Sequence, residues 1–462
     1  MTVAFAFDNS FARLPAQMFT KVAATPVKAP RLRAWNAGLA REMGLPDMTA
    51  DEKASIFSGN EAPDGSEPLA ALYAGHQFGH WNPQLGDGRA ILLGEVIGGG
   101  GARYDVQLKG AGPTPYSRSG DGRNWVGPAL REYLVSEAMH ALGVPTTRAL
   151  ALVTTGEIVV RDAPLPGAIV TRVARSHIRV GSFQVLAARG ELETLEALVA
   201  HTIERHFPEA TSPEDLLSAA VSAQASLIAH WLSLGFIHGV MNTDNAHVAG
   251  DTIDYGPCAF LDDYDPGKAF SSIDHAGRYA YANQPNIAAW NLAQLATALL
   301  PLIPDRDAAI TRFTEIVNGF APAYQAAWRA RFGAKLGLGP LDDAGVELTT
   351  ELLSMMADAK ADFTNTFQTL SADALSDPRY ADWYARWQHC APDEDLMVRA
   401  NPQVIPRNHL VEEVILAAVQ DDWAPFDALY AAVTDPFAAP SNPAYTQPPE
   451  PHEIVHQTFC GT

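Results

Sequence analysis

The chain has 462 residues, of which 47% are hydrophobic and 18% charged, and its formal net charge is −21. This balance is typical of a soluble globular protein of two or three domains, and its acidity argues against a general nucleic-acid binder, which needs a basic surface. No run of 18 or more apolar residues predicts a membrane span, and no signal-peptide pattern opens the chain. We therefore expect a cytoplasmic protein with neither nucleic acid nor a membrane as its partner.

The first part of the chain changes character near residue 70. Residues 1–70 are expected to form an N-terminal extension, irregular except for one helix over residues 29–45. Residues 71–185 carry glycine-rich turns and β-branched runs, which predict a strand-rich domain with nucleotide-binding loops. Its expected strands are residues 89–97, 103–110, 158–162 and 168–174, and its one expected helix is residues 128–145. A local excess of 11 Lys and Arg over 8 Asp and Glu between residues 86 and 180 favours a phosphate-bearing small ligand.

Helical periodicity dominates the rest of the chain. Residues 186–335 are expected to form a helical domain, in which a capped helix over residues 211–236 ends at Gly235, just before a polar loop. Residues 336–462 are expected to add further helices and a proline-rich, extended tail at 435–453. The order predicts an α+β, protein-kinase-like fold of two lobes: a strand-rich N-lobe and a helical C-lobe, with the two terminal additions.

The polar loop follows a kinase catalytic pattern with one departure. In "IHGVMNTDNAHVAGDTIDYGP", residues 237–257, His238 and Asn245 have the spacing of His-Arg-Asp-x-x-x-x-Asn, and Asp254 begins a variant of Asp-Phe-Gly. Val240 occupies the position of the catalytic base. Asn245 and Asp254 are suited to bind magnesium, and Asp244 could replace the missing base. The alternative is an ordinary Asx-rich turn.

The strand-rich domain adds candidate nucleotide contacts. Gly86 and Gly88 form a tight turn into a strand, which lets backbone approach a phosphate, although an ordinary hairpin turn is the commoner meaning of this pattern. Lys109 ends the next strand, and Glu132 on the following helix is placed to form the kinase Lys–Glu ion pair. The alternative is a strand lysine and a helix glutamate that only mimic this arrangement.

Two further polar groups have competing interpretations. Arg172, Arg175 and Arg179 either clamp anionic oxygens or form a solvated edge. His76 and His80 have the spacing of a helical metal pair, but Gly75 and Gly79 disfavour a helix there.

With these residues assembled, the chain resembles the selenoprotein O family of kinase-like protein adenylyltransferases. The resemblance covers nearly the whole chain and is carried by "FDNSFARLP", "YAGHQFGHWNPQLGDGRAILLGE", "LKGAGPTPYSRSGDGR", "REYLVSEAMHALGVPTTRAL", "HGVMNTDN", "IDYGP" and "DHAGRYAYANQP". It implies that ATP binds the opposite way round from a kinase, so that AMP passes to a Ser, Thr or Tyr hydroxyl of a protein substrate, or of the chain itself.

The resemblance also implies roles for individual residues. Asn245 and Asp254 would bind magnesium or manganese, Asp244 would accept the proton, and Glu132 would pair with Lys109. Arg172 and Arg179 would hold the outer phosphates of ATP. The remaining nucleotide contacts would be Gly86, Gly88, Arg89, Lys109, Asp121 and Gly122, while "NWVGPAL" at residues 124–130 departs from the usual family segment.

The cysteines are too few and too scattered to form a disulfide framework. They are Cys258, Cys390 and Cys460. Bacterial relatives imply a regulatory pairing of Cys258 with Cys460, against the alternative of one buried and one free thiol. Two other functions stay open at this point: a conventional protein phosphotransferase, and a catalytically silent nucleotide-binding scaffold.

Overall fold

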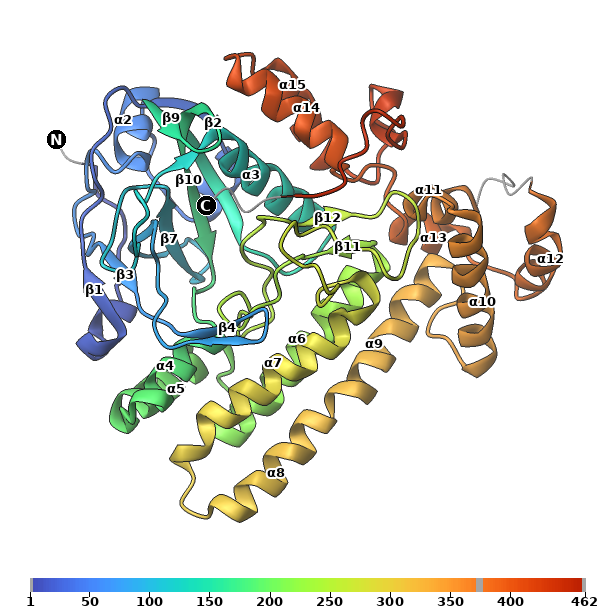
Figure 1. Cartoon of the computed structure of the whole chain (residues 1–462), viewed down its shortest axis with the longest axis horizontal. Helices are drawn as coiled ribbons and strands as arrows, with labels where there is room; N and C mark the ends of the chain where they lie inside the picture. The colour runs from blue at the N-terminus through green and yellow to red at the C-terminus, as the bar shows by residue number, and fades with distance from the viewer. Residues whose placement is uncertain (1–2, 371–376, 459–462) are drawn as a thin grey trace.

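The computed structural model describes residues 3–370 and 377–458. Within these ranges the chain forms a mixed α/β structure (Figure 1). A sheet-rich part is built from the first 175 or so residues, and a helical part follows it. The division agrees with the change in sequence character from β-branched runs to helical periodicity.

One antiparallel, eight-stranded sheet organises the first part. Seven strands follow the order β1-β3-β6-β7-β10-β9-β2, and β8 pairs with β10. Two separate two-stranded sheets lie outside it: the hairpin β4–β5 and the pair β11–β12. The strands are β1 Phe19–Lys21, β2 Arg31–Trp35, β3 Leu69–Ala71, β4 Gly75–Gln77, β5 His80–Asn82, β6 Ala90–Ile97, β7 Arg103–Lys109, β8 Asn124–Trp125, β9 Arg148–Val160, β10 Pro164–Ala174, β11 Phe236–Ile237 and β12 Ala259–Phe260.

Helices cover the sheet and build the second part. They are α1 Ala37–Glu42, α2 Ala50–Phe57, α3 Val126–Ala141, α4 Val180–Arg189, α5 Leu192–His206, α6 Pro213–Ser233, α7 Gln284–Leu299, α8 Arg306–Asn318, α9 Phe320–Lys335, α10 Asp343–Ala359, α11 Phe363–Thr369, α12 Ala381–His389, α13 Glu394–Ala400, α14 Asn408–Val419 and α15 Ala424–Val433. The tail at 435–453 has only a short 3-10 turn, Pro443–Thr446.

The helix expected over residues 29–45 is wrong in its first half. Arg31–Trp35 is strand β2, which pairs with β9 at the edge of the main sheet, and helix α1 begins only at Ala37. The Asn36 side chain accepts a hydrogen bond from the amide of Leu39, so this residue caps the helix and divides the segment. The N-terminal segment is therefore part of the sheet rather than an irregular extension.

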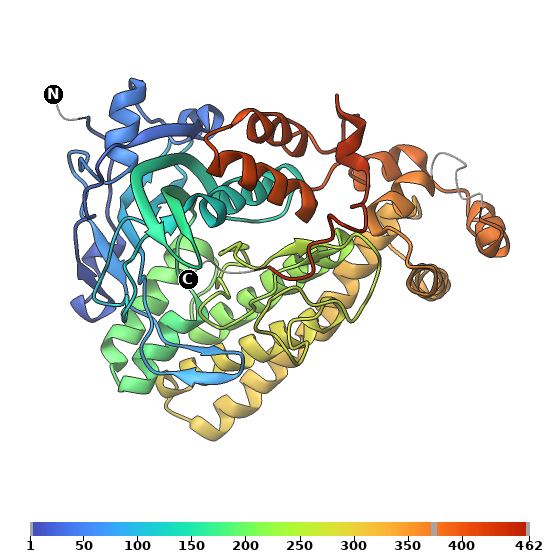
Figure 2. The same ribbon diagram turned by 45° about the horizontal axis from the view of Figure 1, so that its top comes forward.

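Alternating side chains give the sheet two apolar faces. Val153 and Ile169 pack toward α1 and α2, whereas their neighbours Leu152 and Val170 pack toward α3. Helices α14 and α15 add to the α3 side, so residues near the end of the chain cover the helix that carries Glu132 (Figure 2). This packing fixes α3 against the middle of the sheet.

Helix α6 leads into the polar loop. The Ser212 side chain accepts from the amide of Asp215 and caps its start, and the helix ends at Ser233. Within the described residues it is the one helix long and apolar enough to cross a membrane, and 72% of its most apolar window is buried inside the fold. A buried core helix of a globular protein has the same length and composition, and α6 packs against α7, α8 and α9.

Candidate active site

Four charged side chains meet where the sheet, α3 and the polar loop converge. Lys109 Nζ lies 2.6 Å from Glu132 Oε2, and Arg172 donates to the other oxygen of the same carboxylate at 2.8 Å through Nε. Lys109 also pairs with Asp254, and Arg172 Nη2 lies 3.4 Å from Asp254 Oδ1. The expected Lys–Glu contact is therefore present, within a larger cluster of two cations and two carboxylates, here called the charged cluster.

Strand register and helix packing bring the charged cluster together. Lys109 lies opposite Val170, and Gln107 lies opposite Arg172, so Lys109 and Arg172 project from the same face of the sheet. Helix α3 packs across that face and presents Glu132, which is fully enclosed. The four groups come from β7, α3, β10 and the loop after α6, and their charges cancel.

Both carboxylates of the charged cluster are ionised. Burial opposes the charge on Asp254, but Lys109 and Arg172 outweigh this effect and hold its pKa well below the usual range. Burial likewise opposes the charge on Glu132, and the same two cations lower its pKa. Asp254 has a backbone φ of +69°, an uncommon conformation for a residue other than glycine, and such strain concentrates at functional sites.

Asp244 lies in the loop with its two oxygens in different environments. Gln77 Nε2 donates to Oδ2 at 3.0 Å, whereas Oδ1 is buried and has no hydrogen-bond partner within the described chain. Burial raises the pKa of Asp244 to about 6, against the opposing effect of the Gln77 hydrogen bond. A carboxylate of this kind is suited to accept a proton near neutral pH.

Asn245 and Asp254 offer oxygen ligands of the kind magnesium prefers. Asn245 Nδ2 donates to the carbonyl of Val240 at 3.1 Å, so the amide oxygen is directed away from that contact. Asp254 uses Oδ1 for the two cations, which leaves its second oxygen for a metal. Across residues 3–370 and 377–458, no three His, Cys, Asp or Glu side chains gather as a metal site.

The glycine turn before β6 is covered by another segment. A Cβ on Gly86 would lie 2.5 Å from the Tyr116 ring, and a Cβ on Gly88 would lie 2.9 Å from the Tyr116 carbonyl oxygen. Both glycines are thus required by the approach of Tyr116, whatever ligand binds there. Between them, Asp87 accepts hydrogen bonds from Gln107 and the amide of Ala71, and it lies 3.6 Å from Arg179.

Arg179 is buried at the start of α4 and stacks over Tyr73, with 4.5 Å between the guanidinium carbon and the ring centroid. Its Nε has no hydrogen-bond partner within the described part of the chain, so this cation retains a free donor.

Other predicted residues lie outside the charged cluster or at its margin. Burial raises the pKa of Asp254, whereas Lys109, Arg172 and, more weakly, Arg89 lower it. The positive charge of Arg89 therefore lies near the charged cluster. Asp121 is held by Arg161 in two contacts of 2.9 Å and is about half exposed, and Gly122 follows it in a left-handed conformation. Arg175 was one of three arginines expected either to clamp anionic oxygens or to form a solvated edge, and the resemblance left it without a role; its side chain pairs with Asp251 at 2.6 Å.

The cysteines can be placed in part. Cys258 is buried, and burial raises its pKa to about 12. Cys460 lies outside the described residues, but Thr458 is described, and its hydroxyl donates to the carbonyl of Pro257 at 2.7 Å. Cys390 is exposed on a different part of the fold. The end of the described tail is therefore anchored one residue before Cys258.

Gln77, Gly75 and Asp87 contact the predicted site but were not predicted from the sequence. The pattern "LGDGR" does carry a signal for Asp87, because a carboxylate between two glycines is typical of a specialised turn. No local signal identifies Gln77, whose partner lies 167 residues away in the sequence.

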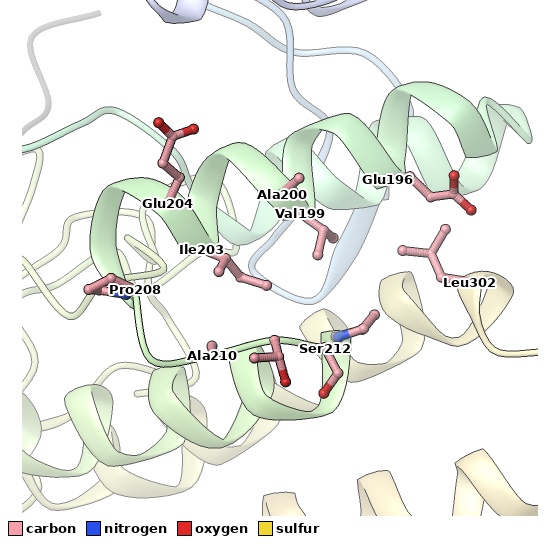
Figure 3. A pocket seen from close by; sticks show the side chains of 11 residues that line it. Glu196, Val199, Ala200, Ile203, Glu204, Pro208, Ala210, Ser212 and Leu302 are labelled. Atoms are coloured by element: carbon pink, nitrogen blue, oxygen red, sulfur yellow. The ribbon is translucent and has the colours of Figure 1, made fainter.

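A separate apolar groove of about 640 Å³ lies between α5 and the start of α6 (Figure 3). Val199, Ile203, Pro208 and Leu302 line it, and none of the predicted site residues does. The groove is at the end of α6 remote from the polar loop, so it is not the site of the predicted chemistry.

Comparison with known proteins places the chain in a family. The family model described as "Protein adenylyltransferase SelO" matches residues 1–434. The chain is 55% identical to the "Protein nucleotidyltransferase YdiU" of Ruegeria sp. (strain TM1040) over 472 aligned positions and to that of Roseobacter denitrificans over 471, with all of both chains covered in each case. The chain therefore belongs to the SelO family of protein adenylyltransferases.

Proposed function

We propose that the chain is a protein adenylyltransferase that moves AMP from ATP to Ser, Thr or Tyr hydroxyls of proteins, on a two-lobed, kinase-like fold. The observation that carries this proposal is the pair of neighbouring features in the loop after α6. Asp244 has one buried carboxylate oxygen without a partner, and the charged cluster next to it joins Lys109 to Asp254. Family membership supports AMP rather than phosphate as the transferred group.

The reaction follows from these positions. The acceptor hydroxyl oxygen attacks the α-phosphorus of ATP, its proton passes to the Asp244 carboxylate, and the bond from the α-phosphorus to pyrophosphate breaks. Lys109 is held by Glu132, so its ammonium stays directed toward the site and stabilises phosphate charge. Arg179, with its buried free donor, is available for an outer phosphate.

Magnesium or manganese fits the oxygen donors of Asn245 and Asp254, together with nucleotide phosphates. When bound, such an ion neutralises phosphate charge and bridges the nucleotide to the protein. The protein's own part is to keep Asp254 ionised, which Lys109 and Arg172 do.

Products distinguish this function from its alternatives. With ATP and a protein acceptor, the proposal expects pyrophosphate to be released in equal amount to acceptor modified, and expects an Asp244→Asn variant to lose most of the rate. Release of ADP with a phosphorylated acceptor would instead establish a phosphotransferase. ATP binding without either product would indicate a silent nucleotide-binding scaffold.

We propose in addition that Cys258 and Cys460 form a regulatory disulfide. The anchoring of Thr458 on Pro257 supports it, because it brings the tail next to Cys258. An oxidant such as peroxide would take two electrons and two protons from the thiols as the S–S bond forms. Non-reducing peptide mapping after peroxide treatment should find the Cys258–Cys460 peptide, and its reduction should change the rate of AMP transfer in the parent but not in Cys460→Ser. Oxidised protein that lacks this peptide would contradict the proposal.

A further inference from the structure

The hairpin formed by β4 and β5 packs against the loop that carries Asp244 (Figure 1). The amide of His76 donates to Thr243 Oγ1 at 2.7 Å, and the amide of Phe78 donates to Asn242 Oδ1 at 3.0 Å. These contacts join the hairpin backbone to side chains of a loop that is far away in the sequence. The hairpin is thus fixed to the residues immediately before Asp244.

Strand register divides the side chains of the hairpin between two faces. Gly75 is opposite Asn82, and Gln77 is opposite His80, so these four residues share one face. His76 and Trp81 form the other face, where their rings lie 4.9 Å apart. His76 and His80 therefore project to opposite sides, unlike a helical metal pair. The face of Gly75 and Gln77 is the one that meets Asp244.

On that face, two amides and one carboxylate form a directed chain of hydrogen bonds. Asn82 Nδ2 donates to Gln77 Oε1 at 3.0 Å, and Gln77 Nε2 donates to Asp244 Oδ2 at 3.0 Å. An amide presents oxygen on one side and nitrogen on the other, so the donation from Asn82 fixes which end of Gln77 faces the carboxylate. Asn82 therefore acts on Asp244 through Gln77.

Gly75 leaves room for the second oxygen of Asp244. A Cβ at Gly75 would lie 2.8 Å from Asp244 Oδ1 and 3.1 Å from the Asp244 Cβ. The carboxylate is thus bounded by the hairpin on one side and held by Gln77 through Oδ2. Oδ1 is buried against Gly75 and has no hydrogen-bond partner among the described residues, so the hydrogen bond from Gln77 to Oδ2 is the polar contact that orients the carboxylate.

We propose that Gln77 is a positioning residue for Asp244, and that Asn82 sets the direction of the Gln77 amide, so that the Asp244 carboxylate is held in one orientation for proton transfer from the acceptor hydroxyl. This inference rests on the proposed function, in which Asp244 accepts the hydroxyl proton. Neither Gln77 nor Asn82 needs to contact ATP or the acceptor. Their effect is on the rate of transfer at saturating substrate and not on nucleotide affinity.

Isosteric substitutions test the chain of hydrogen bonds. Gln77→Leu removes the donor to Asp244. Asn82→Asp keeps the shape of residue 82 but replaces its donor with an acceptor, so the Gln77 amide would turn and present its oxygen to Asp244. Gln84→Leu is the matched control, because Gln84 lies close in sequence and contacts Arg189 instead.

The kinetic expectation is a split between kcat and affinity. Gln77→Leu should lower kcat for AMP transfer by about 10- to 100-fold, while the KM and Kd for Mg-ATP change by less than about twofold. Asn82→Asp should lower kcat by about fivefold or more, and the double variant should match Gln77→Leu alone, since Asn82 acts through Gln77. An unchanged kcat in Gln77→Leu, a parallel loss of ATP binding, or additive effects in the double variant would overturn the proposal. In any of these cases, AMP transfer by the parent would leave the proposed function standing.

A spectroscopic measurement tests the same contacts without activity. The side-chain amide resonances of Gln77, identified by their loss in Gln77→Leu, should shift in Asp244→Asn and in Asn82→Asp but not in Gln84→Leu. Resonances that stay in place in both of the first two variants would refute the chain of hydrogen bonds. If the parent transferred no AMP, the proposed function would fail, and this measurement would still decide whether Gln77 holds Asp244.

Discussion

Glu132→Gln should destabilise the protein by about 3 kcal/mol, because it removes one negative charge from a buried, neutral cluster. The side chains of Glu132 and Arg172 are each 4% exposed, and that of Lys109 is 7% exposed. Breaking a buried ion pair at one partner costs about 3–5 kcal/mol. The lower figure applies here because the glutamine oxygen can still accept one hydrogen bond.

Urea denaturation of parent and variant measures this change, with Glu214→Gln as the control. Glu214 pairs with Arg312 at 3.2 Å on the surface, where the arginine side chain is 46% exposed, so its loss should cost less than about 1 kcal/mol. Glu132→Gln should also weaken Mg-ATP binding, since Lys109 loses its support. A Glu132→Gln protein as stable as the control variant would refute the view that the charged cluster depends on charge balance.

Three further predictions test separate parts of the account. Asp254→Ala should abolish metal-dependent ATP binding in a nucleotide titration. Asp244→Ala should retain ATP binding but lose about 10²-fold or more in transfer rate. An equal loss of ATP binding in both variants would contradict the assigned roles. Gly75→Ala should slow transfer by about tenfold or more in a steady-state assay, because its Cβ displaces Asp244, while Gly99→Ala, with no atom within 4 Å of its Cβ, should not. Burial lowers the pKa of Lys335 to about 7 from 10.5, so the folded state binds fewer protons than the unfolded state and stability rises with pH across that interval. Lys335→Met should therefore be more stable than the parent at pH 7, by about 1–3 kcal/mol because the substitution also removes the contact of the Lys335 ammonium with the Phe367 ring, and urea titrations should find this advantage shrinking as the pH approaches 10; an advantage independent of pH would contradict it.

Local signals predicted the strands and the helix that carry the charged cluster. The runs at 89–97 and 103–110, separated by glycines, correspond to strands β6 and β7, and the amphipathic segment 128–145 overlaps helix α3, which begins two residues earlier and ends at Ala141. Each has a periodicity or turn signal that does not depend on distant residues. The helix predicted over residues 29–45 was wrong in its first half because pairing with β9 outweighs the helical pattern there. The local sequence carries no information about that pairing.

The candidate site could be predicted only for residues whose order along the chain matches the order of a kinase active site. The order of Lys109, Glu132 and the Asn245–Asp254 loop indicated a nucleotide site, and the structure brings the Lys109, Glu132 and Asp254 side chains together. The role of Gln77 depends on a contact across 167 residues, and that of Arg172 on the register between β7 and β10. Both contacts are properties of the tertiary fold, so no sequence motif predicts them.

The central claim is that the α-phosphate of ATP, and not the γ-phosphate, is transferred to protein. Incubation of a protein acceptor and the chain with ATP labelled at one or the other phosphate tests it most directly. The account predicts that label from the α-phosphate becomes covalently attached to protein, that label from the γ-phosphate does not, and that Asp244→Asn loses most of the incorporation. Incorporation from the γ-phosphate alone would contradict the account and establish a phosphotransferase.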